Sequence, residues 1–582
     1  MHDLVIKAAT IVDGTGGPTR VGDVTVDGGQ ISSIDAPDQA GAGMREIDGD
    51  GLALTPGWVD IHTHYDGQVT WDPQVSPSSW HGVTTVVMGN CGVGFAPVRP
   101  DARDFLIELM ESIEDIPGSA LHEGIDWQWE SFPEYLDAIA RTPRTIDIAA
   151  QVPHAALRAY VMGDRAHDEA TADEIDAMAR LTEEALLAGA VGFTTSRTIL
   201  HRSRHGYEPG TFAPPDELLA MGDAIGRAGR GVFQLVSDHA GSDEELSWLT
   251  EVARRSHSTV TYALAQTGPD PTGYRRALEQ AKIAAGDGLT IVPQVSVRPT
   301  GMLFGLQSSL HPFITHPTYR TLAALPLDER VASLRRPEVR AALLAEEPST
   351  SNRIAVSLMS RWELMFPLGE PPDYEPHPSS SAAGVAASSG RLPQEVVLDW
   401  LLERDGKALL FAPLASYADG DHEALREMMD NPHTVVGLSD GGAHCGLICD
   451  ASFPTYLLTH WARDRSRGPR LPLEQAVHLQ TGRTAATYGL TDRGTIEVGK
   501  RADLNLVDLD GLTLHEPEMV FDLPAGGRRL VQHVDGYKAT VVAGEVTYED
   551  GSATGARPGR LVRSGPRAGG RAAPSRRPHP SR

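Results

Sequence analysis

Cysteine is scarce in this chain, with only Cys91, Cys445 and Cys449 among 582 residues. Three thiols in so long a chain exclude a disulfide framework and favour a reducing compartment. The first residues lack a basic start followed by a long apolar region, so we expect no secretory signal and a cytoplasmic protein. The same scarcity leaves each thiol free for another role, such as binding a metal ion.

Long hydrophobic runs and an excess of positive charge are also missing. No stretch of about 18 apolar residues occurs, so we expect no membrane contact through a spanning helix. The formal charge of −27 opposes binding to nucleic acid or to an anionic membrane surface. The remaining partner class is a small molecule, and the sequence is compatible with a homo-oligomer.

Strand-like and helix-like segments alternate along most of the chain. Helical apolar spacing over 173–189 is followed directly by a strand-like segment at 190–195. Repeated units of this kind predict an α/β fold, a TIM-like (β/α)8 barrel over residues 55–490. Short alternating strands at 1–54 and 491–550 predict a small β-sandwich that both chain ends build together.

Three further segments differ in composition from the barrel. Proline, serine and histidine cluster near 101–129 and 301–390, which is typical of inserted loops over a site. The tail at 555–582 has arginine as its only formally charged residue type, set among Gly, Pro, Ser and Ala. We expect this basic tail to be disordered.

Residues that bind metals follow three of the apolar strand-like segments. His62 and His64 follow the first, Cys91 the second and Asp440 the third. Side chains two residues apart in a strand share a face, and strand ends converge at one face of a parallel barrel. Imidazole, thiolate and carboxylate groups together suit zinc rather than magnesium or calcium. We therefore predict a zinc site at the C-terminal face of the barrel.

Each of these residues alone also has a structural explanation. A His-x-His pair is often hydrogen-bonded within a fold, and a lone buried cysteine is usually a small hydrophobic residue. Their common position at strand ends favours the metal site. With zinc bound, Asp440 would accept a proton from water and pass it to a leaving amine, so an amide would be hydrolysed without a covalent intermediate.

Basic residues near other strand ends are candidates for substrate binding. Arg197 and His201 follow the strand that begins near residue 190, and Arg298 follows a later strand. Arginine can receive a carboxylate through two hydrogen bonds, although a solvated loop explains these residues equally well. His444, four residues after Asp440, either orients that carboxylate or is a structural histidine of the loop.

Six segments resemble the amidohydrolase superfamily, and within it the D-aminoacylase branch of N-acyl-D-amino-acid deacylases. They are TPGWVDIHTHYD at 55–66, GNCG at 89–92, SFPEYL at 131–136, QVPH at 151–154, SDG at 439–441 and GTIEVGKRAD at 494–503. The resemblance covers about residues 1–550. It implies a metal-dependent barrel flanked by a β-sandwich, with cysteine in place of the carbamylated lysine of hydantoinase relatives. The lysine content agrees, because no lysine ends a predicted strand in the middle of the barrel.

The chain departs from the family at two further metal histidines, which normally follow the fifth and sixth strands. The corresponding stretches, 231–239 and 260–266, offer Asp238 or His239 as replacements, and Gln234 and Gln266 as poor zinc ligands. We therefore expect one firmly bound Zn²⁺. The expected activity is hydrolysis of a C–N amide bond in an N-acyl amino acid, for which the resemblance implies the D configuration, or in a related small amide. The alternatives are a cyclic-amide hydrolase and a catalytically silent scaffold.

Overall fold

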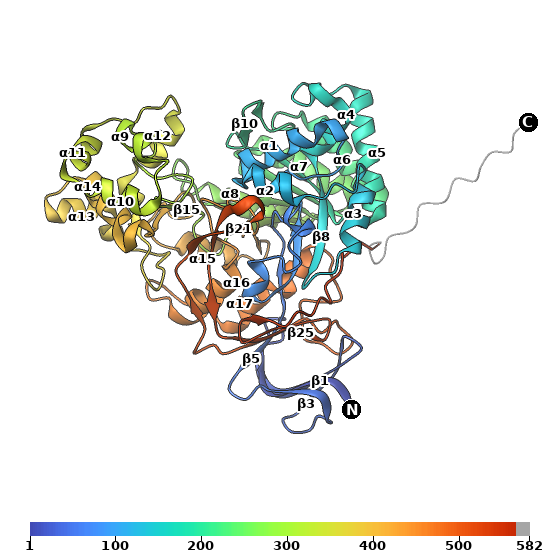
Figure 1. Cartoon of the computed structure of the whole chain (residues 1–582). Helices are drawn as coiled ribbons and strands as arrows, with labels where there is room; N and C mark the ends of the chain where they lie inside the picture. Colours follow the sequence, from blue (N-terminus) through green and yellow to red (C-terminus); the bar gives the residue numbers. More distant parts are fainter. Residues whose placement is uncertain (566–582) are drawn as a thin grey trace, which may run out of the picture.

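The computed structural model describes residues 1–565, which form a parallel barrel, a terminal sheet and an inserted subdomain (Figure 1). Eight parallel strands follow one another around the barrel in chain order. They are β6 (Trp58–Asp60), β7 (Val83–Met88), β8 (Asp147–Pro153), β9 (Gly192–Arg197), β12 (Val232–Ser237), β13 (Val260–Ala263), β14 (Ile291–Val295) and β18 (Val435–Val436). An isolated parallel bridge between Thr63 and Gly441 joins the segment after the first strand, β6, to the segment after the last strand, β18. The predicted barrel is confirmed.

Helices surround the barrel, and their ends follow local sequence signals. They are α3 (Phe132–Arg141), α4 (His154–Met162), α5 (Ala172–Ala188), α6 (Pro215–Ala228), α7 (Asp243–Ser256), α8 (Gly273–Gly286), α15 (Glu423–Asp430), α16 (Phe453–Tyr456), α17 (Leu473–Gln480) and α18 (Gly482–Thr487). Thr171 and Glu174 form a reciprocal capping box at the start of α5. The helix predicted at 173–189 is therefore present, and Gly189 ends it with a φ of 121°.

Both chain ends build one additional sheet, as predicted. Its hydrogen-bonded path is β26 (Ser552–Ala553), β25 (Glu545–Glu549), β24 (Tyr537–Val542), β19 (Leu504–Val507), β5 (Ala53–Pro56), β1 (His2–Ile11), β2 (Arg20–Asp27) and β3 (Gln30–Asp35), with β4 (Gly43–Asp48) beside β1. The antiparallel pair β5–β19 joins the two ends, with Leu54 opposite Leu506. The strands form one continuous sheet rather than two separate ones, because this pair bridges the N-terminal and C-terminal strands.

The first expected insertion is helical rather than a loop. It contains α1 (Arg103–Glu114) and α2 (Gly118–Gly124). Leu106, Ile107, Met110 and Ile113 form the buried side of α1. Because these apolar residues recur at helical spacing, α1 packs on the barrel instead of extending into solvent.

The second expected insertion forms a subdomain that continues beyond residue 390. Its elements are β15 (Gly301–Phe304), α9 (Pro317–Leu322), α10 (Leu327–Leu334), α11 (Pro337–Ala345), α12 (Arg353–Met359), β16 (Phe366–Pro367), α13 (Ala382–Ser389), α14 (Pro393–Leu401) and β17 (Leu410–Pro413). Phe304, Leu334 and Leu398 belong to its own hydrophobic cluster. Figure 1 shows these helices on the opposite side of the molecule from α4, α5 and α6.

The basic tail is partly ordered, so the expectation of disorder from residue 555 onward is wrong for 555–565. Ile148 of β8 donates a backbone hydrogen bond to Arg560 O at 3.0 Å and accepts one from Val562 N at 2.7 Å. Strand β9 pairs with β8 only from Gln151 onward, so the tail occupies the part of β8 that β9 leaves open. Residues 566–582 lie outside the described residues. No helix among residues 1–565 is long and apolar enough to cross a membrane.

Candidate metal centre and catalytic site

The loops after β6 and β18 are held together by hydrogen bonds, and this brings Asp440 beside the histidine pair. Asp440 N donates to His62 O at 3.1 Å, and His64 N donates to Gly441 O at 2.8 Å. Ser439 Oγ donates to Asp60 Oδ2 at 2.5 Å, which ties the same loop to the end of β6. Asp440 adopts a φ of 48°, so the chain turns sharply at the residue whose side chain enters the site.

The four predicted metal ligands converge, and we call them the metal cluster: His62, His64, Cys91 and Asp440. His62 Nε2 lies 3.3 Å from Cys91 Sγ and 3.4 Å from Asp440 Oδ1. His64 Nε2 lies 3.7 Å from the same carboxylate oxygen. Ligands about 2.0–2.3 Å from a tetrahedral zinc ion lie roughly 3.3–3.8 Å apart, so these separations fit zinc.

The GNCG motif forms a turn that only small residues allow. Cys91 has a φ of 57°, and its neighbours Gly89 and Gly92 have values of 81° and 80°. A Cβ atom at Gly89 would lie 2.5 Å from Gln151 O. Asn90 secures the turn by donating to Thr63 O at 3.1 Å and to Val87 O at 2.9 Å. The turn therefore presents the Cys91 thiol at the end of β7.

The environment of the imidazoles favours neutral, metal-binding rings. His62 Nδ1 lies 2.8 Å from Gln294 Oε1, which can only accept, so Nδ1 carries the hydrogen and Nε2 is left with a lone pair. Burial lowers the pKa of both His62 and His64. Although burial opposes it, the nearby imidazoles, His64 foremost, lower the pKa of Asp440 below its usual value. Asp440 is therefore an anion beside these rings.

Burial also raises the pKa of the Cys91 thiol well above its usual value. The carboxylates of Glu114 and Asp440 raise it further, because a thiolate beside them would repel both. A divalent cation reverses this effect, since a coordinated thiol is deprotonated. The protein environment alone therefore makes Cys91 a poor nucleophile, and a bound cation would be needed to hold it as a thiolate.

Two predicted substrate residues lie near the metal cluster. His444 Nε2 is 3.9 Å from Asp440 Oδ2, which places His444 beside the predicted base. His201 Nδ1 lies 2.9 Å from Ser196 Oγ and 3.0 Å from Glu208 Oε2. Glu208, the partner of His201, lies beside the GNCG turn, since a Cβ atom at Gly92 would be 2.5 Å from Glu208 Oε1.

The expectation that Arg197 faces the metal is not met. Its Nε donates to Glu245 Oε1 at 3.0 Å, and its Nη1 donates to Ala213 O at 2.6 Å. Its guanidinium also lies 5.8 Å from the ring centroid of Trp248, on the same helix α7 as Glu245. Because successive strand residues face opposite sides of a sheet, Ser196 reaches His201 while Arg197 points to the helix layer.

Arg298 is fully buried in a polar and aromatic environment. Its Nε donates to Asp450 Oδ1 at 3.0 Å, and its guanidinium carbon lies 3.8 Å from the ring centroid of Tyr374. Its Nη1 has no hydrogen-bond partner among the described residues. Arg298 thus has a structural ion pair and one donor group without a partner.

The residues in the stretches that correspond to the two missing family histidines do not form a second metal site. Gln234 Oε1 accepts from Cys91 N at 3.2 Å, so an amide stands beside the thiol. Asp238 instead accepts from Thr198 Oγ1 at 2.6 Å, and Gln266 donates to Asp419 Oδ2 at 2.6 Å. His239 is exposed. Neither suggested replacement, Asp238 nor His239, reaches the metal cluster.

Sequence reasoning missed two buried carboxylates near the cluster. Glu114 Oε1 lies 3.5 Å from His64 Nδ1, and Glu208 is the partner of His201. A signal for Glu114 existed, because it follows Ile107 and Met110 at helical spacing on the apolar side of α1. A carboxylate in an apolar stripe indicates a buried polar contact.

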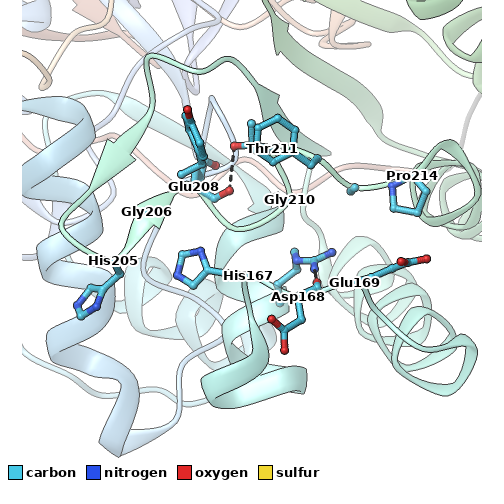
Figure 2. A pocket seen from close by; sticks show the side chains of 13 residues that line it. His167, Asp168, Glu169, His205, Gly206, Glu208, Gly210, Thr211 and Pro214 are labelled. Carbon is cyan, nitrogen blue, oxygen red and sulfur yellow. Dashed lines mark hydrogen bonds between the residues drawn. The ribbon is translucent and has the colours of Figure 1, made fainter.

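A cavity of about 430 Å³ lies beside Glu208 (Figure 2). Figure 2 shows His167, Asp168 and Glu169 on one wall, and Glu208, Gly210 and Thr211 of the β11 loop (β11, Gly206–Tyr207) on the other. Thr211 Oγ1 donates to Glu208 O at 2.9 Å and stabilises that loop. A Cβ atom at Gly92 would lie 2.5 Å from Glu208 Oε1, so Glu208 reaches from this cavity to the GNCG turn.

A second group of potential metal ligands, Glu375, His422 and His460, is largely buried and contacts Arg465. We call these four residues the arginine cluster: Glu375, His422, His460 and Arg465. His460 Nε2 lies 3.0 Å from Glu375 Oε2, and His422 Nδ1 lies 3.7 Å from it. Arg465 donates to both oxygens of Glu375, at 3.1 and 2.9 Å. The guanidinium already neutralises this carboxylate, so the geometry is that of an ion pair.

The chain matches the model of the amidohydrolase family over residues 45–548, and it belongs to this family. It is 29% identical to the N-acyl-D-aspartate deacylase of Alcaligenes xylosoxydans xylosoxydans, over 97% of this chain and 95% of that protein. It is 28% identical to the D-aminoacylase of the same organism, over 96% and 97%. The predicted family is therefore confirmed.

Solved structures of this branch share the fold. A D-aminoacylase crystal structure superposes with a TM-score of 0.63 at 24% identity, covering 97% of this chain and 100% of that one. The N-acyl-D-glutamate deacylase of Bordetella bronchiseptica, solved with zinc and a phosphonate inhibitor, gives a TM-score of 0.64 at 22% identity, covering 97% and 99%. The predicted fold class is confirmed by these neighbours.

Proposed function

We propose that this protein is a zinc-dependent hydrolase that cleaves the amide bond of an N-acyl-D-amino acid. The observation that carries the proposal is the metal cluster, in which two imidazoles and a thiol meet the carboxylate of Asp440 at the barrel face. The D configuration rests on the curated relatives, which are named as deacylases of D-amino acid derivatives. The partner that we propose for this site is a small-molecule amide.

The chain's own residues account for proton transfer in this reaction. Zinc, when bound, polarises the amide carbonyl and lowers the pKa of a water molecule. Asp440 accepts a proton from the attacking water and delivers it to the leaving nitrogen. His444 lies 3.9 Å from Asp440 Oδ2 and limits the movement of this carboxylate between the two transfers. No protein nucleophile is required.

We propose one zinc ion per chain, held by His62, His64, Cys91 and Asp440. The support is the side chain beside Cys91 on β12, which is the amide of Gln234 rather than an imidazole. An amide oxygen is a weak zinc ligand, and this one already accepts a hydrogen bond from Cys91 N. A second ion would therefore lack a protein ligand set.

We propose that His201 and Arg298 recognise the carboxylate of the substrate. Glu208 holds Nδ1 of His201, and this leaves Nε2 available. Arg298 keeps one buried nitrogen, Nη1, without a partner, and the cost of such a buried donor is removed when an anion accepts from it. An acyl amino acid offers this anion next to the scissile amide.

The proposal is tested by elemental analysis of protein expressed with zinc, joined to a substrate panel. The panel contains N-acetyl-D-amino acids, their L enantiomers and cyclic amides. We expect about one zinc per chain and hydrolysis of the D compounds above all others. Preferred opening of cyclic amides would support the rival activity, and zinc-loaded protein without hydrolysis of any compound would support a silent scaffold.

A further inference from the structure

Three buried polar atoms beside the metal cluster have no hydrogen-bond partner among the described residues. They are Nδ1 of His64 and both carboxylate oxygens of Glu114. Side-chain exposure is 1% for each residue, so bulk solvent does not reach these atoms. Since an unsatisfied buried polar group costs free energy, groups placed so close together point to a shared role.

Glu114 lies between two histidines of the site. Its Oε1 is 3.5 Å from His64 Nδ1, and its Oε2 is 3.5 Å from His444 Nε2. The opposite nitrogen of His64, Nε2, faces Asp440 in the metal cluster. A ring that binds a metal through Nε2 carries its hydrogen on Nδ1, and Glu114 Oε1 is 3.5 Å from that nitrogen.

The main chain fixes Glu114 in this place. His444 N donates to Glu114 O, so the loop after β18 is hydrogen-bonded directly to the end of α1. Asp115 follows with a φ of 50° and accepts from Gly446 N at 3.0 Å. Ser309 of the inserted subdomain donates to Asp115 at 2.9 Å. Two inserted segments and the loop after β18 therefore contact one another at Glu114 and Asp115.

We infer that Glu114 is a positioning residue, which fixes the ring of His64 for the metal and the ring of His444 beside Asp440. The inference rests on the proposed zinc site. Each of the two oxygens of Glu114 faces one of these histidines, so both oxygens are used as acceptors. Contacts between a carboxylate and a metal-bound histidine orient the ring and strengthen its bond to the metal.

The consequence is that zinc affinity depends on an inserted helix outside the barrel. Removing an outer contact of this type lowers metal affinity or activity by about 10–100-fold. Glu114→Gln keeps the volume of the side chain, but its amide group can accept from only one of the two histidines. We therefore expect its zinc dissociation constant to rise at least about tenfold.

The test compares wild type, Glu114→Gln and Glu111→Gln. Glu111 is the matched control because it lies on the same helix and, among the described residues, accepts from Gly118 N at 2.9 Å rather than from a histidine of the site. Zinc affinity is measured by competition with a chelator, and the visible spectrum of the cobalt-substituted protein reports ligand geometry. The melting temperature of the metal-free protein reports stability alone. We expect weaker zinc binding and a changed cobalt spectrum in Glu114→Gln only.

Equal zinc affinity and equal cobalt spectra in all three proteins would overturn the inference. A lower melting temperature of the metal-free Glu114→Gln protein with unchanged zinc affinity would also overturn it, because that pattern belongs to a merely structural carboxylate. Zinc binding that depends on Glu114 in a protein inactive on acyl amino acids would reject the proposed substrate but leave the role of Glu114 standing.

Discussion

The metal cluster and the arginine cluster are built from similar residues but have different chemistry. Each brings a carboxylate and two histidines within a few ångströms, and each is largely buried. In the arginine cluster, Arg465 donates to both oxygens of Glu375. In the metal cluster no lysine or arginine contacts Asp440 among the described residues, and a thiol takes the corresponding place. The comparison shows that a resident guanidinium separates an ion-pair network from a metal site.

Because the carboxylates of Glu375 and Asp440 are buried, the presence or absence of a positive partner changes the free energy of the folded protein. A buried carboxylate needs a positive partner, since desolvation of an unpaired charge costs several kcal/mol. Although burial opposes it, hydrogen bonds from His460 and Arg465 lower the pKa of Glu375 far below its usual value. Among the described residues Asp440 has imidazoles but no lysine or arginine beside it, so a metal cation is the partner that we propose for it. The predictions below test whether the two clusters differ in this way.

The largest effect is expected at the carboxylate of the metal cluster. Asp440→Asn removes the base but keeps the shape of the side chain, so kcat should fall by about two to four orders of magnitude with the fold retained. Steady-state kinetics and circular dichroism measure the two quantities. Turnover within a fewfold of wild type would reject the role of Asp440.

Zinc content should respond to one cluster and not to the other. Cys91→Ala removes the only sulfur ligand, and we expect zinc affinity to fall by more than about a hundredfold, beyond the loss typical of outer contacts. His460→Ala in the arginine cluster should keep the zinc content of wild type. Elemental analysis after dialysis measures both variants. Zinc loss in His460→Ala would show that the arginine cluster also binds metal.

The free energy of unfolding of the metal-free protein should depend on the arginine cluster, whereas zinc content depends on the metal cluster. Glu375→Gln leaves Arg465 buried beside a neutral amide, and we expect the free energy of unfolding to fall by about 3 kcal/mol. Denaturant unfolding of the metal-free protein measures this change, with zinc affinity as the control. An unchanged unfolding midpoint would mean that Glu423, the second partner of Arg465, suffices alone.

The same variant gives a pH signature. The pKa of Glu375 is lower in the folded chain than its usual value of 4.5, so its contribution to stability is fully present above that value. The contribution is lost as the pH falls toward the lowered pKa of the folded state. Wild type should therefore lose stability below about pH 4.5 more steeply than Glu375→Gln. Parallel stability curves for both proteins would contradict the ion pair.

The smallest effect is expected at Arg197. Its hydrogen bonds go to Glu245 and Ala213 in the helix layer, so Arg197→Ala should change KM for an acyl amino acid by less than about threefold. Arg298→Ala serves as the comparison, because this residue has the unpartnered nitrogen that we assign to the carboxylate. A strong rise of KM in Arg197→Ala would show that Arg197 contributes to substrate binding.

The sequence predicted the metal cluster because its signals are local. His62, His64, Cys91 and Asp440 each follow an apolar strand, and parallel strands in a barrel bring such positions to one face. The sequence could not indicate Glu114 as firmly, because its partners His64 and His444 come from distant parts of the chain. Only an unusual carboxylate in the apolar stripe of α1 pointed to it.

The sequence by itself determined the barrel, the pairing of the chain ends and the ligand types, since strand periodicity and residue chemistry are properties of short segments. Tertiary structure alone decided the direction of Arg197, the ordered course of residues 555–565 along β8 and the choice of Arg465 as partner of Glu375. Each of these three features depends on contacts between segments that are far apart in the sequence. A side chain's role follows from the charge that the fold places beside it. Within residues 1–565 the fold places a guanidinium at the carboxylate of Glu375 and none at that of Asp440.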